Sequence, residues 1–335
     1  MPVKVHILLL NNAMLSSVTG PLDAFSAAGT LWSQMMGAPP EPAFSVRLIG
    51  ESALPLAYSG GLTLIPQHTL ESADIADIVY VPSMILLPGQ ALPANMARIA
   101  DWLRHQHQSG ALLCSVCTGA YVLAYAGLLQ GLQATTHWGF AHDFQRRFPA
   151  VKLQKNAVIV HNPVQRIITC GGGTSWHNLV SDLIREHSSI DIADQVKSLL
   201  LMNEHRHGQG AYARNLPMAA PEDRAVAAVQ QWLKTHSDQA NPVQQALAQT
   251  ALAERTLKRR FKKHMGVSII EYVQALRIGN AKELLVKSTT AIEEIARRVG
   301  YQDASFFRRI FRAETGLSPS HFRERFGRAR SQRVD

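Results

Sequence analysis

The sequence predicts a flavodoxin-like α/β part, a parallel sheet with helices on both faces, followed by an all-α part with two helix-turn-helix motifs. Three observations carry this prediction. Short apolar runs alternate with helical segments over residues 1–190, a segment near the C-terminus occurs twice, and the excess positive charge lies in the last third of the chain. Strand–helix alternation is typical of parallel sheets, and an internal repeat indicates one supersecondary unit used twice.

The predicted strands of the first part are short apolar runs. Residues 3–10 are continuously apolar, which is typical of a strand buried on both faces. Gly20 and Pro21 are predicted to open a helix that ends near Gly29, because proline favours the first helical position and glycine the end. Further strands are expected at residues 44–49, 78–82 and 111–116, with helices at 94–107 and 119–126.

The chain is expected to pass into its second part through a linker. Residues 190–236 are predicted to be helical apart from a glycine-containing stretch at 208–210, and residues 218–223 are the best linker candidate. We therefore predict a first domain at 1–190, a helical extension and linker at 191–222, and a basic helical domain at 223–330.

Composition indicates a globular protein. Of the 335 residues, 46% are hydrophobic and 18% are charged. The apolar N-terminal run is short and has no cleavage site, so it is not a signal peptide. No apolar stretch is long enough to span a bilayer, and three cysteines are too few for a disulfide scaffold. We expect a cytoplasmic protein with no membrane partner.

The positive charge is confined to the C-terminal third. Residues 221–335 contain 21 Lys and Arg against 12 Asp and Glu, which accounts for the whole net charge of +9, and residues 1–220 are neutral. A neutral body with a basic module indicates a polyanionic partner, and DNA phosphate is the commonest.

The repeat lies in this basic region. Residues 257–268 match residues 307–318 at an offset of fifty, and the paired positions are Leu257 and Phe307, Phe261 and Phe311, Gly266 and Gly316, and Ser268 and Ser318. In each copy a short helix, a turn and a longer helix follow one another, which is the helix-turn-helix pattern.

Capping residues set the expected helix bounds. Asn241 is predicted to cap a helix that begins at Pro242, and Thr290 with Glu293 is predicted to form a capping box. Asp303 is predicted to cap a helix over 304–315, and the matching helix of the first copy is expected at 254–264. Residues 269–286 fit one long helix that joins the two copies.

The longer helix of each copy has an apolar face and a basic face. The side chains expected on the outer faces are Arg255, Lys258, Arg259, Lys262 and Lys263 in the first copy and Ser305, Arg308, Arg309 and Arg312 in the second. Arginine can donate two parallel hydrogen bonds to guanine in the major groove. The alternative is a solvated basic face, or a bundle that binds acidic protein, but two matched copies favour DNA.

The last hundred residues resemble the AraC/XylS family of transcription regulators. The resemblance rests above all on residues 295–319, IARRVGYQDASFFRRIFRAETGLSP. It implies two helix-turn-helix motifs that read successive segments of the major groove, with Arg255, Lys258, Arg259, Ser305, Arg308 and Arg309 at the base-reading positions. Ala253 departs from the family, which usually has a capping serine there.

A second motif lies in the first domain, where a buried strand runs directly into a helix at Cys117. Ser115 and Gly119 flank this cysteine, and small neighbours at these positions are typical of a nucleophile elbow. A helix N-terminus would also lower the pKa of the thiol. His137 lies downstream as a possible partner.

These residues resemble the class I glutamine amidotransferase-like superfamily, which includes PfpI and deglycase-type proteins. They resemble most closely the variant fused to AraC-type domains, through residues 117–138, 21–25 and 206–209. Superfamily enzymes usually add a carboxylate. Here Asp23 is expected on a helix, and Trp138-Gly139 follows the histidine, so the triad is incomplete.

We therefore predict a non-catalytic ligand pocket, with a Cys-His enzyme and an inert dimerisation scaffold as alternatives. The expected ligand-binding residues are Cys117, Thr118, Gly119, His137, Trp138, Thr174 and Trp176. Backbone N–H groups at the turn favour a carboxylate or other anion. We expect no metal and no cofactor, and no redox pair between Cys114 and Cys117, because Cys114 lies within the strand.

The functional prediction is a sequence-specific DNA-binding transcription regulator, an activator, in which residues 1–190 sense a small metabolite and dimerise. The expected partners are promoter DNA, an amino-acid-like or anionic effector, RNA polymerase and a second copy in a homodimer. The alternative is a Cys117-dependent amidase, deglycase or lyase fused to a DNA-binding domain.

Overall fold

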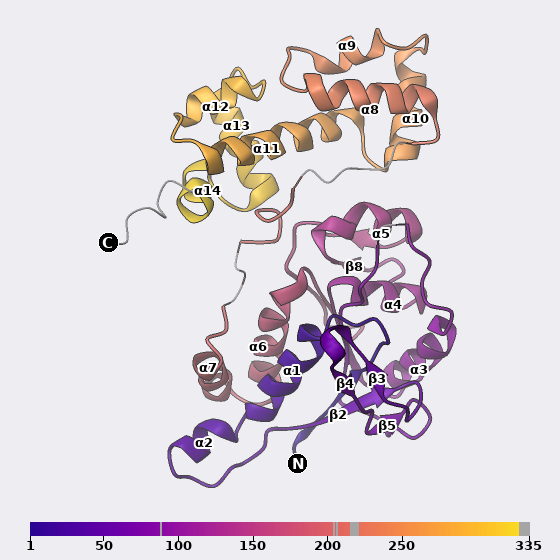
Figure 1. Cartoon of the computed structure of the whole chain (residues 1–335), viewed down its shortest axis with the longest axis vertical. Coiled ribbons are helices and arrows are strands. Elements are labelled where there is room, and N and C mark those ends of the chain that lie inside the picture. Colours follow the sequence, from indigo (N-terminus) through magenta and orange to yellow (C-terminus); the bar gives the residue numbers. More distant parts are fainter. Residues whose placement is uncertain (88, 204, 206, 215–220, 328–335) are drawn as a thin grey trace. The chain divides into compact units, whose positions relative to one another are not determined.

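The computed structural model describes residues 1–87, 89–203, 205, 207–214 and 221–327. The chain forms two compact units, Met1–Gln209 and Gly210–Asp335 (Figure 1). The first is α/β and the second is helical, as predicted. Among the described helices, none is both long enough and apolar enough to cross a membrane.

A seven-stranded sheet forms the centre of the first unit. Its strand order is β10-β11-β7-β6-β1-β2-β5, and every neighbouring pair is parallel except β10 with β11. The strands are β1 Val3–Leu8, β2 Phe44–Gly50, β5 His68–Thr69, β6 Ile78–Val81, β7 Leu112–Val116, β10 Ile159–Asn162 and β11 Ile167–Cys170. The mostly parallel sheet confirms the predicted fold class.

Helices cover both faces of this sheet, with α1, α6 and α7 on one side and α3 and α4 on the other (Figure 1). Their bounds are α1 Ser16–Ala27, α3 Met96–Gln108, α4 Ala120–Tyr125, α6 Trp176–His187 and α7 Ile190–Leu199; the shorter α2 and α5 span Leu31–Met35 and Ala141–Arg147. Small elements lie at the edges: strands β3 Leu56–Ala57, β4 Thr63–Leu64, β8 Gln133–Ala134 and β9 Lys152–Leu153, and 3-10 turns η1 Ser59–Gly61, η2 Cys117–Gly119, η3 Trp138–Phe140 and η4 Gly173–Ser175.

Helix α1 begins earlier than predicted. It starts at Ser16, so Pro21 lies inside the helix and not at its first position. Backbone bonds from Ser17 to Met14 and from Val18 to Leu15 already form the first turn. Gly20 packs against Trp176 of α6, since a Cβ at Gly20 would lie 2.3 Å from Trp176 Cζ2. The prediction of a start at Gly20 was therefore wrong.

The first unit also extends beyond residue 190. Helix α7 packs Ala193 and Val196 into the core of the sheet unit, so it belongs to that unit. Part of the predicted linker, residues 215–220, lies outside the described residues.

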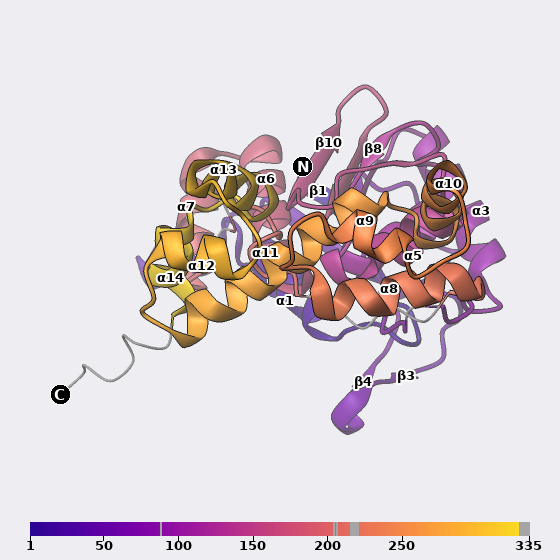
Figure 2. The same cartoon turned by 90° about the horizontal axis from the view of Figure 1, so that it is seen from above.

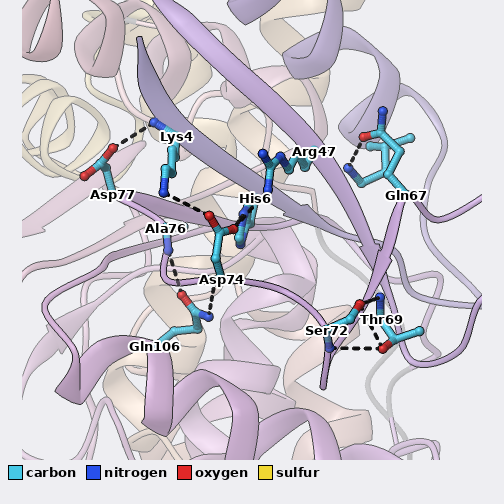
Figure 3. A network of polar contacts seen from close by, with 11 residues as sticks. Lys4, His6, Arg47, Gln67, Thr69, Ser72, Asp74, Ala76, Asp77 and Gln106 are labelled. Carbon is cyan, nitrogen blue, oxygen red and sulfur yellow. Dashed lines mark hydrogen bonds and ion pairs between the residues drawn. The ribbon is translucent and has the colours of Figure 1, made fainter. Parts of the chain in front are cut away.

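A polar network ties the loops at the amino ends of the strands (Figure 3). Asp74 pairs with Lys4 at 2.9 Å and lies 3.2 Å from His6 Nε2. The fully buried Gln106 accepts a hydrogen bond from Ala76 N and donates one to the Asp74 carbonyl, both at 3.0 Å. This network is at the end of the sheet opposite to Cys117.

The second unit consists of seven described helices, of which α11 is the long helix that joins the other two groups (Figure 2). Their bounds are α8 Arg224–His236, α9 Pro242–Leu247, α10 Glu254–Met265, α11 Ile269–Lys287, α12 Ile292–Arg298, α13 Ala304–Thr315 and α14 Pro319–Phe326. One core forms around α10, with Leu257 and Phe261 fully buried. A second forms around α13, with Phe307 and Phe311 fully buried. Each copy of the repeat thus packs around a core of its own.

The helix ends confirm some predicted caps and contradict others. Gly266 and Gly316 end α10 and α13 with φ of 70° and 75°, and Asp303 caps α13 by accepting from Ser305 N. Thr290 forms no capping box, because the N-cap of α12 is Ala291. Asn241 precedes α9 but is itself left-handed (φ 49°), and its side chain accepts no capping bond.

Candidate ligand site and nucleic-acid interface

Cys117 occupies a strained turn directly after β7. Its φ of 56° is in the left-handed region, which is unfavourable for a residue with a Cβ. The turn lies close to the end of β6, since a Cβ at Gly119 would be 2.6 Å from the Pro82 carbonyl oxygen and 2.7 Å from that of Val81. The geometry is that of a nucleophile elbow, and it explains why position 119 is a glycine.

Thr118 joins the loops that follow three strands. Its hydroxyl donates to the Met84 carbonyl at 2.6 Å, accepts from Met84 N at 2.8 Å and lies 3.1 Å from Ser83 Oγ. Ser83 N in turn donates to Ser17 Oγ at 3.0 Å. The hydroxyl of Thr118 is therefore engaged in holding the elbow.

The acid–base state of Cys117 and His137 does not favour a nucleophile. Burial raises the pKa of the Cys117 thiol, although hydrogen bonds with Ser83 and Thr118 oppose the shift. Burial lowers the pKa of His137, and its Nδ1 accepts from Gly139 N at 3.0 Å. The described contacts include no hydrogen bond between the thiol and the imidazole, so both groups are neutral near pH 7.

No carboxylate contacts His137 in the described part of the chain. Asp143 accepts from Tyr121 Oη at 3.0 Å and pairs with Arg147 at 2.8 Å, and Asp23 is exposed on α1. The structure thus assembles the elbow without the acid that a triad would need.

The loop that carries His137 lies against the elbow. Thr136 Oγ1 donates to the Cys117 carbonyl at 2.8 Å, and the rings of His137 and Trp138 have centroids 5.1 Å apart. A Cβ at Gly172 would be 3.4 Å from His137 Cδ2, which places the loop after β11 beside the same ring. The carboxyl ends of β7 and β11 therefore border one site, as expected for ligand binding in open α/β sheets.

Two other predicted contact residues differ in exposure. Thr174 is exposed, and its Oγ1 lies 3.0 Å from His205 Nε2. Trp176 is only 8% exposed and packs over Gly20 within the core. The ring of Trp176 is therefore part of the hydrophobic core in this structure.

Sequence reasoning missed Gln209 as a part of this site. Its side chain is buried, and its Nε2 donates to the Thr136 carbonyl at 2.7 Å and to the Ala157 carbonyl at 3.0 Å. Its Oε1 accepts from Trp138 N at 2.9 Å. The signal was present in the match of residues 206–209 to the family variant; Arg206 lies outside the described residues.

The described residues contain no group of three or more His, Cys, Asp or Glu side chains that could hold a metal ion. Cys114, Cys117 and Cys170 are all free thiols and all are buried. Cys114 lies within β7, as expected.

In the second unit, the nine predicted DNA-contacting side chains are all exposed. They are Arg255, Lys258, Arg259, Lys262 and Lys263 on α10 and Ser305, Arg308, Arg309 and Arg312 on α13. Helix α10 buries Leu257, Phe261 and Met265 in its own core, and α13 buries Phe307 and Phe311 in the other, whereas Phe306 of α13 is exposed. Each helix thus presents a basic face opposite a fully buried one.

The two basic faces differ in how their cations are held. On α13, Arg308 pairs with Glu293 of α12, and the Arg309 guanidinium lies 5.1 Å from the centre of the Phe306 ring. On α10, Lys258 pairs with Glu254 at 2.5 Å. In the described contacts the other four predicted DNA-contacting side chains of α10 form no ion pair.

Comparison with known proteins covers both units. Residues 3–184 match the DJ-1/PfpI family, and residues 247–325 match a helix-turn-helix domain of the AraC type. The chain is 27% identical to the HTH-type transcriptional regulator GlxA of Rhizobium meliloti, over 97% of this chain and 96% of that protein. It is 26% identical to the HTH-type transcriptional regulator CdhR of Pseudomonas aeruginosa, over 80% of this chain and 78% of that protein.

An enzyme is also among the relatives. Isonitrile hydratase of Pseudomonas putida is 29% identical over 59% of this chain and 77% of that protein. A crystal structure of a Vibrio parahaemolyticus protein assigned as a transcriptional regulator has a TM-score of 0.52 and 22% identity, and it covers 60% of this chain and all of that one. This structural likeness concerns the fold alone.

Proposed function

Because the chain belongs to the DJ-1/PfpI family and ends in an AraC-type helix-turn-helix domain, we propose that it is a transcription regulator that senses a small molecule. The carrying observation is the pair of amphipathic helices α10 and α13, each with a buried apolar face and an exposed basic face. Relatives that are named HTH-type transcriptional regulators, one of them matched over nearly its whole length, support this function.

DNA binding is assigned to the basic faces of α10 and α13. Exposed arginines on a helix can pair with guanine edges, and lysines neutralise backbone phosphates. The nine side chains predicted from the sequence supply both kinds of group. We propose that α13 contributes more to base reading, because Glu293 and Phe306 hold Arg308 and Arg309 in place before DNA arrives.

Sensing is assigned to the Cys117 elbow and the His137 loop. The candidate contacts are Cys117, Gly119, His137, Trp138 and Thr174, with Thr118 holding the turn. A neutral thiol, a neutral imidazole and an indole form a site that is polar without a fixed charge. This supports an effector that is amino-acid-like or otherwise small and that binds through backbone N–H groups and ring contacts.

The experiment for DNA binding is fluorescence anisotropy with a fragment from upstream of the protein's own gene and a scrambled fragment of equal length. Titrations at several salt concentrations give the number of phosphate contacts, because each releases counterions. Arg259→Ala and Arg309→Ala should weaken binding, and removing an arginine that binds a phosphate should lower the salt slope by about 1.

Arg185→Ala is the matched control, since it removes an exposed arginine from α6 of the first unit. Its affinity and salt slope should equal those of the unaltered protein. Affinity that is indifferent to salt and to both recognition-helix variants would overturn the DNA-binding function.

We also propose that the protein acts as a homodimeric activator that contacts RNA polymerase. Two copies would double the number of recognition helices on one promoter and raise affinity through avidity. Analytical ultracentrifugation at micromolar concentration tests the dimer, and in vitro transcription with purified polymerase tests activation.

An enzyme is the second candidate, and the positive φ of Cys117 favours it, since a strained strand-to-helix turn is how a nucleophile elbow holds its reactive side chain. Isonitrile hydratase shows that a relative of the first unit can be enzymatic. The raised thiol pKa and the absence of a described acid beside His137 argue against catalysis here. A Cys117→Ala variant that abolishes turnover of an isonitrile, amide or glycated substrate would establish the enzyme.

A further inference from the structure

One side chain at the end of the first unit is inserted into the candidate ligand site. Gln209 is 3% exposed, and all three polar bonds of its amide to the Thr136, Trp138 and Ala157 backbone are within 3.0 Å. Gly171 leaves room for it, because a Cβ there would lie 2.6 Å from Gln209 Nε2. The amide therefore fixes the backbone on both sides of His137.

The next residue is anchored in the second unit. The Gly210 carbonyl accepts from Lys282 Nζ of α11 at 2.6 Å, and the Ala213 carbonyl accepts from the same Nζ at 2.9 Å. Ala211 is 6% exposed in the core around α13, and the Tyr212 hydroxyl accepts from Arg325 of α14 at 3.0 Å. Contacts within the first unit thus fix Gln209, and contacts within the second unit fix Gly210, the next residue in the chain.

We propose that Gln209 is the positioning residue of the ligand site and the point through which that site is coupled to the DNA-binding unit. The inference rests on the proposed regulator function and deepens it by naming its regulatory connection. The two states are Gln209 seated on the His137 loop and Gln209 released from it.

The physical reason is that Gln209 cannot move onto or off the His137 loop without changing the contacts of the residues on either side of it. A ligand that moves Trp138 or Thr136 removes partners from a buried amide, and a buried polar group without partners is costly. Release of Gln209 pulls on the Gly210 carbonyl and hence on its bonds with Lys282. By thermodynamic linkage, DNA bound to the second unit must then alter the Gln209 equilibrium by the same factor.

The test uses the full chain and iodoacetamide as the probe, with the modification rate of Cys117 followed by peptide mass spectrometry. Cys117 is 4% exposed beside the loop that Gln209 holds, and the fully buried Cys114 and Cys170 serve as internal standards. Rates are measured with and without a saturating upstream DNA fragment, and saturation is verified by gel shift.

Three near-isosteric variants separate the steps. Gln209→Met should speed Cys117 modification at least threefold in the free protein and make it independent of DNA. Lys282→Met should remove the DNA effect, which in the unaltered protein should be at least threefold. It should speed the free-protein rate less than Gln209→Met does, because Gln209 keeps its own partners on the His137 loop. Gln106→Met removes another buried amide, which accepts from Ala76 N at the opposite end of the sheet from Cys117 (Figure 3 shows Gln106 and Ala76). It should change neither the free-protein rate of Cys117 modification nor the rate with DNA bound.

The outcomes discriminate between this inference and the proposed function. Equal Cys117 rates in Gln209→Met and the unaltered protein, or equal acceleration in Gln106→Met, would overturn the positioning role. Normal DNA binding with no effect on Cys117 would overturn the coupling alone. Failure to bind DNA would overturn the regulator function and the coupling with it, while the free-protein rates still decide the positioning role.

Discussion

Gly119→Ala is predicted to destabilise the first unit, because the new methyl group would enter the contact between the elbow and the end of β6. Its Cβ would lie 2.6 Å and 2.7 Å from two backbone carbonyl oxygens. Both partners are main chain, so neither can rotate away. The two backbones must separate by about 0.8 Å to reach an ordinary contact.

The expected magnitude follows from two opposing effects. Overpacking of a well-packed site costs about 1–3 kcal/mol. Gly119 has a φ of −55°, which alanine adopts freely, so the loss of unfolded-chain freedom returns about 0.4–1 kcal/mol. Taking the middle of both ranges, the net destabilisation is about 1–2 kcal/mol, which corresponds to a fall in Tm of about 2–8 °C for a unit of this size.

Thermal unfolding followed by tryptophan fluorescence measures this change, since four of the five tryptophans lie in the first unit. Gly173→Ala is the matched control in the corresponding turn after β11, where the nearest atom to a Cβ is Met14 Sδ at 3.7 Å. Its Tm should stay the same or rise. If Gly119→Ala is as stable as Gly173→Ala, the close approach of the elbow to β6 is refuted.

Three further predictions concern charge. The Arg260 guanidinium lowers the pKa of Asp223, which also caps α8. Asp223→Asn should therefore destabilise the second unit by about 1–2 kcal/mol at pH 7, as hydrogen exchange of α8 will show. The stabilisation by the Asp223 carboxylate is present above about pH 4 and is lost as pH falls through its lowered pKa. The raised pKa of Cys117 predicts slow alkylation at pH 7 and a rate that still climbs above pH 9. Glu293→Gln should release Arg308, raise affinity for scrambled DNA and lower the preference for the upstream fragment about two- to fivefold.

Each of these has an outcome that contradicts it. An Asp223→Asn defect of equal size at pH 7 and pH 3 would exclude the ion pair as its cause. An alkylation rate that has already levelled off at pH 7 would show a thiolate at Cys117 and support the enzyme. Glu294→Gln, which disrupts pairs with Arg297 and Arg298 of the same short helix, is the control for Glu293→Gln, and an identical effect would remove the special role of Arg308.

The elements that sequence analysis placed best carry their own boundary signals. Helix α13 spans Ala304–Thr315 as predicted, because Asp303 supplies a cap and Gly316 supplies a left-handed end. The elbow was found for the same reason, since a buried strand, small flanking residues and the helix that follows are all local in the chain. Features of this kind can be predicted from a single sequence because the residues that determine them are close together in the chain.

The errors arose where tertiary contacts decide. Proline at position 21 suggested a first turn, but packing against Trp176 and the turn at Leu15 extend α1 backwards by four residues. Thr290 has the right spacing for a capping box, yet the backbone places Ala291 at the N-cap. Gln209 bonds to residues more than seventy positions earlier in the chain, a separation that neither spacing nor propensity can reveal.

Helix α11 sets the distance between the two helices that we propose to bind DNA. Its 19 residues span about 28 Å at 1.5 Å per residue, whereas successive turns of the major groove are about 34 Å apart. Because the core around α10 lies at one end and the core around α13 at the other, a single inserted residue would rotate one recognition helix by about 100° relative to its fellow. In the proposed regulator, the length of this one helix therefore sets the spacing and the relative rotation of α10 and α13 along the duplex.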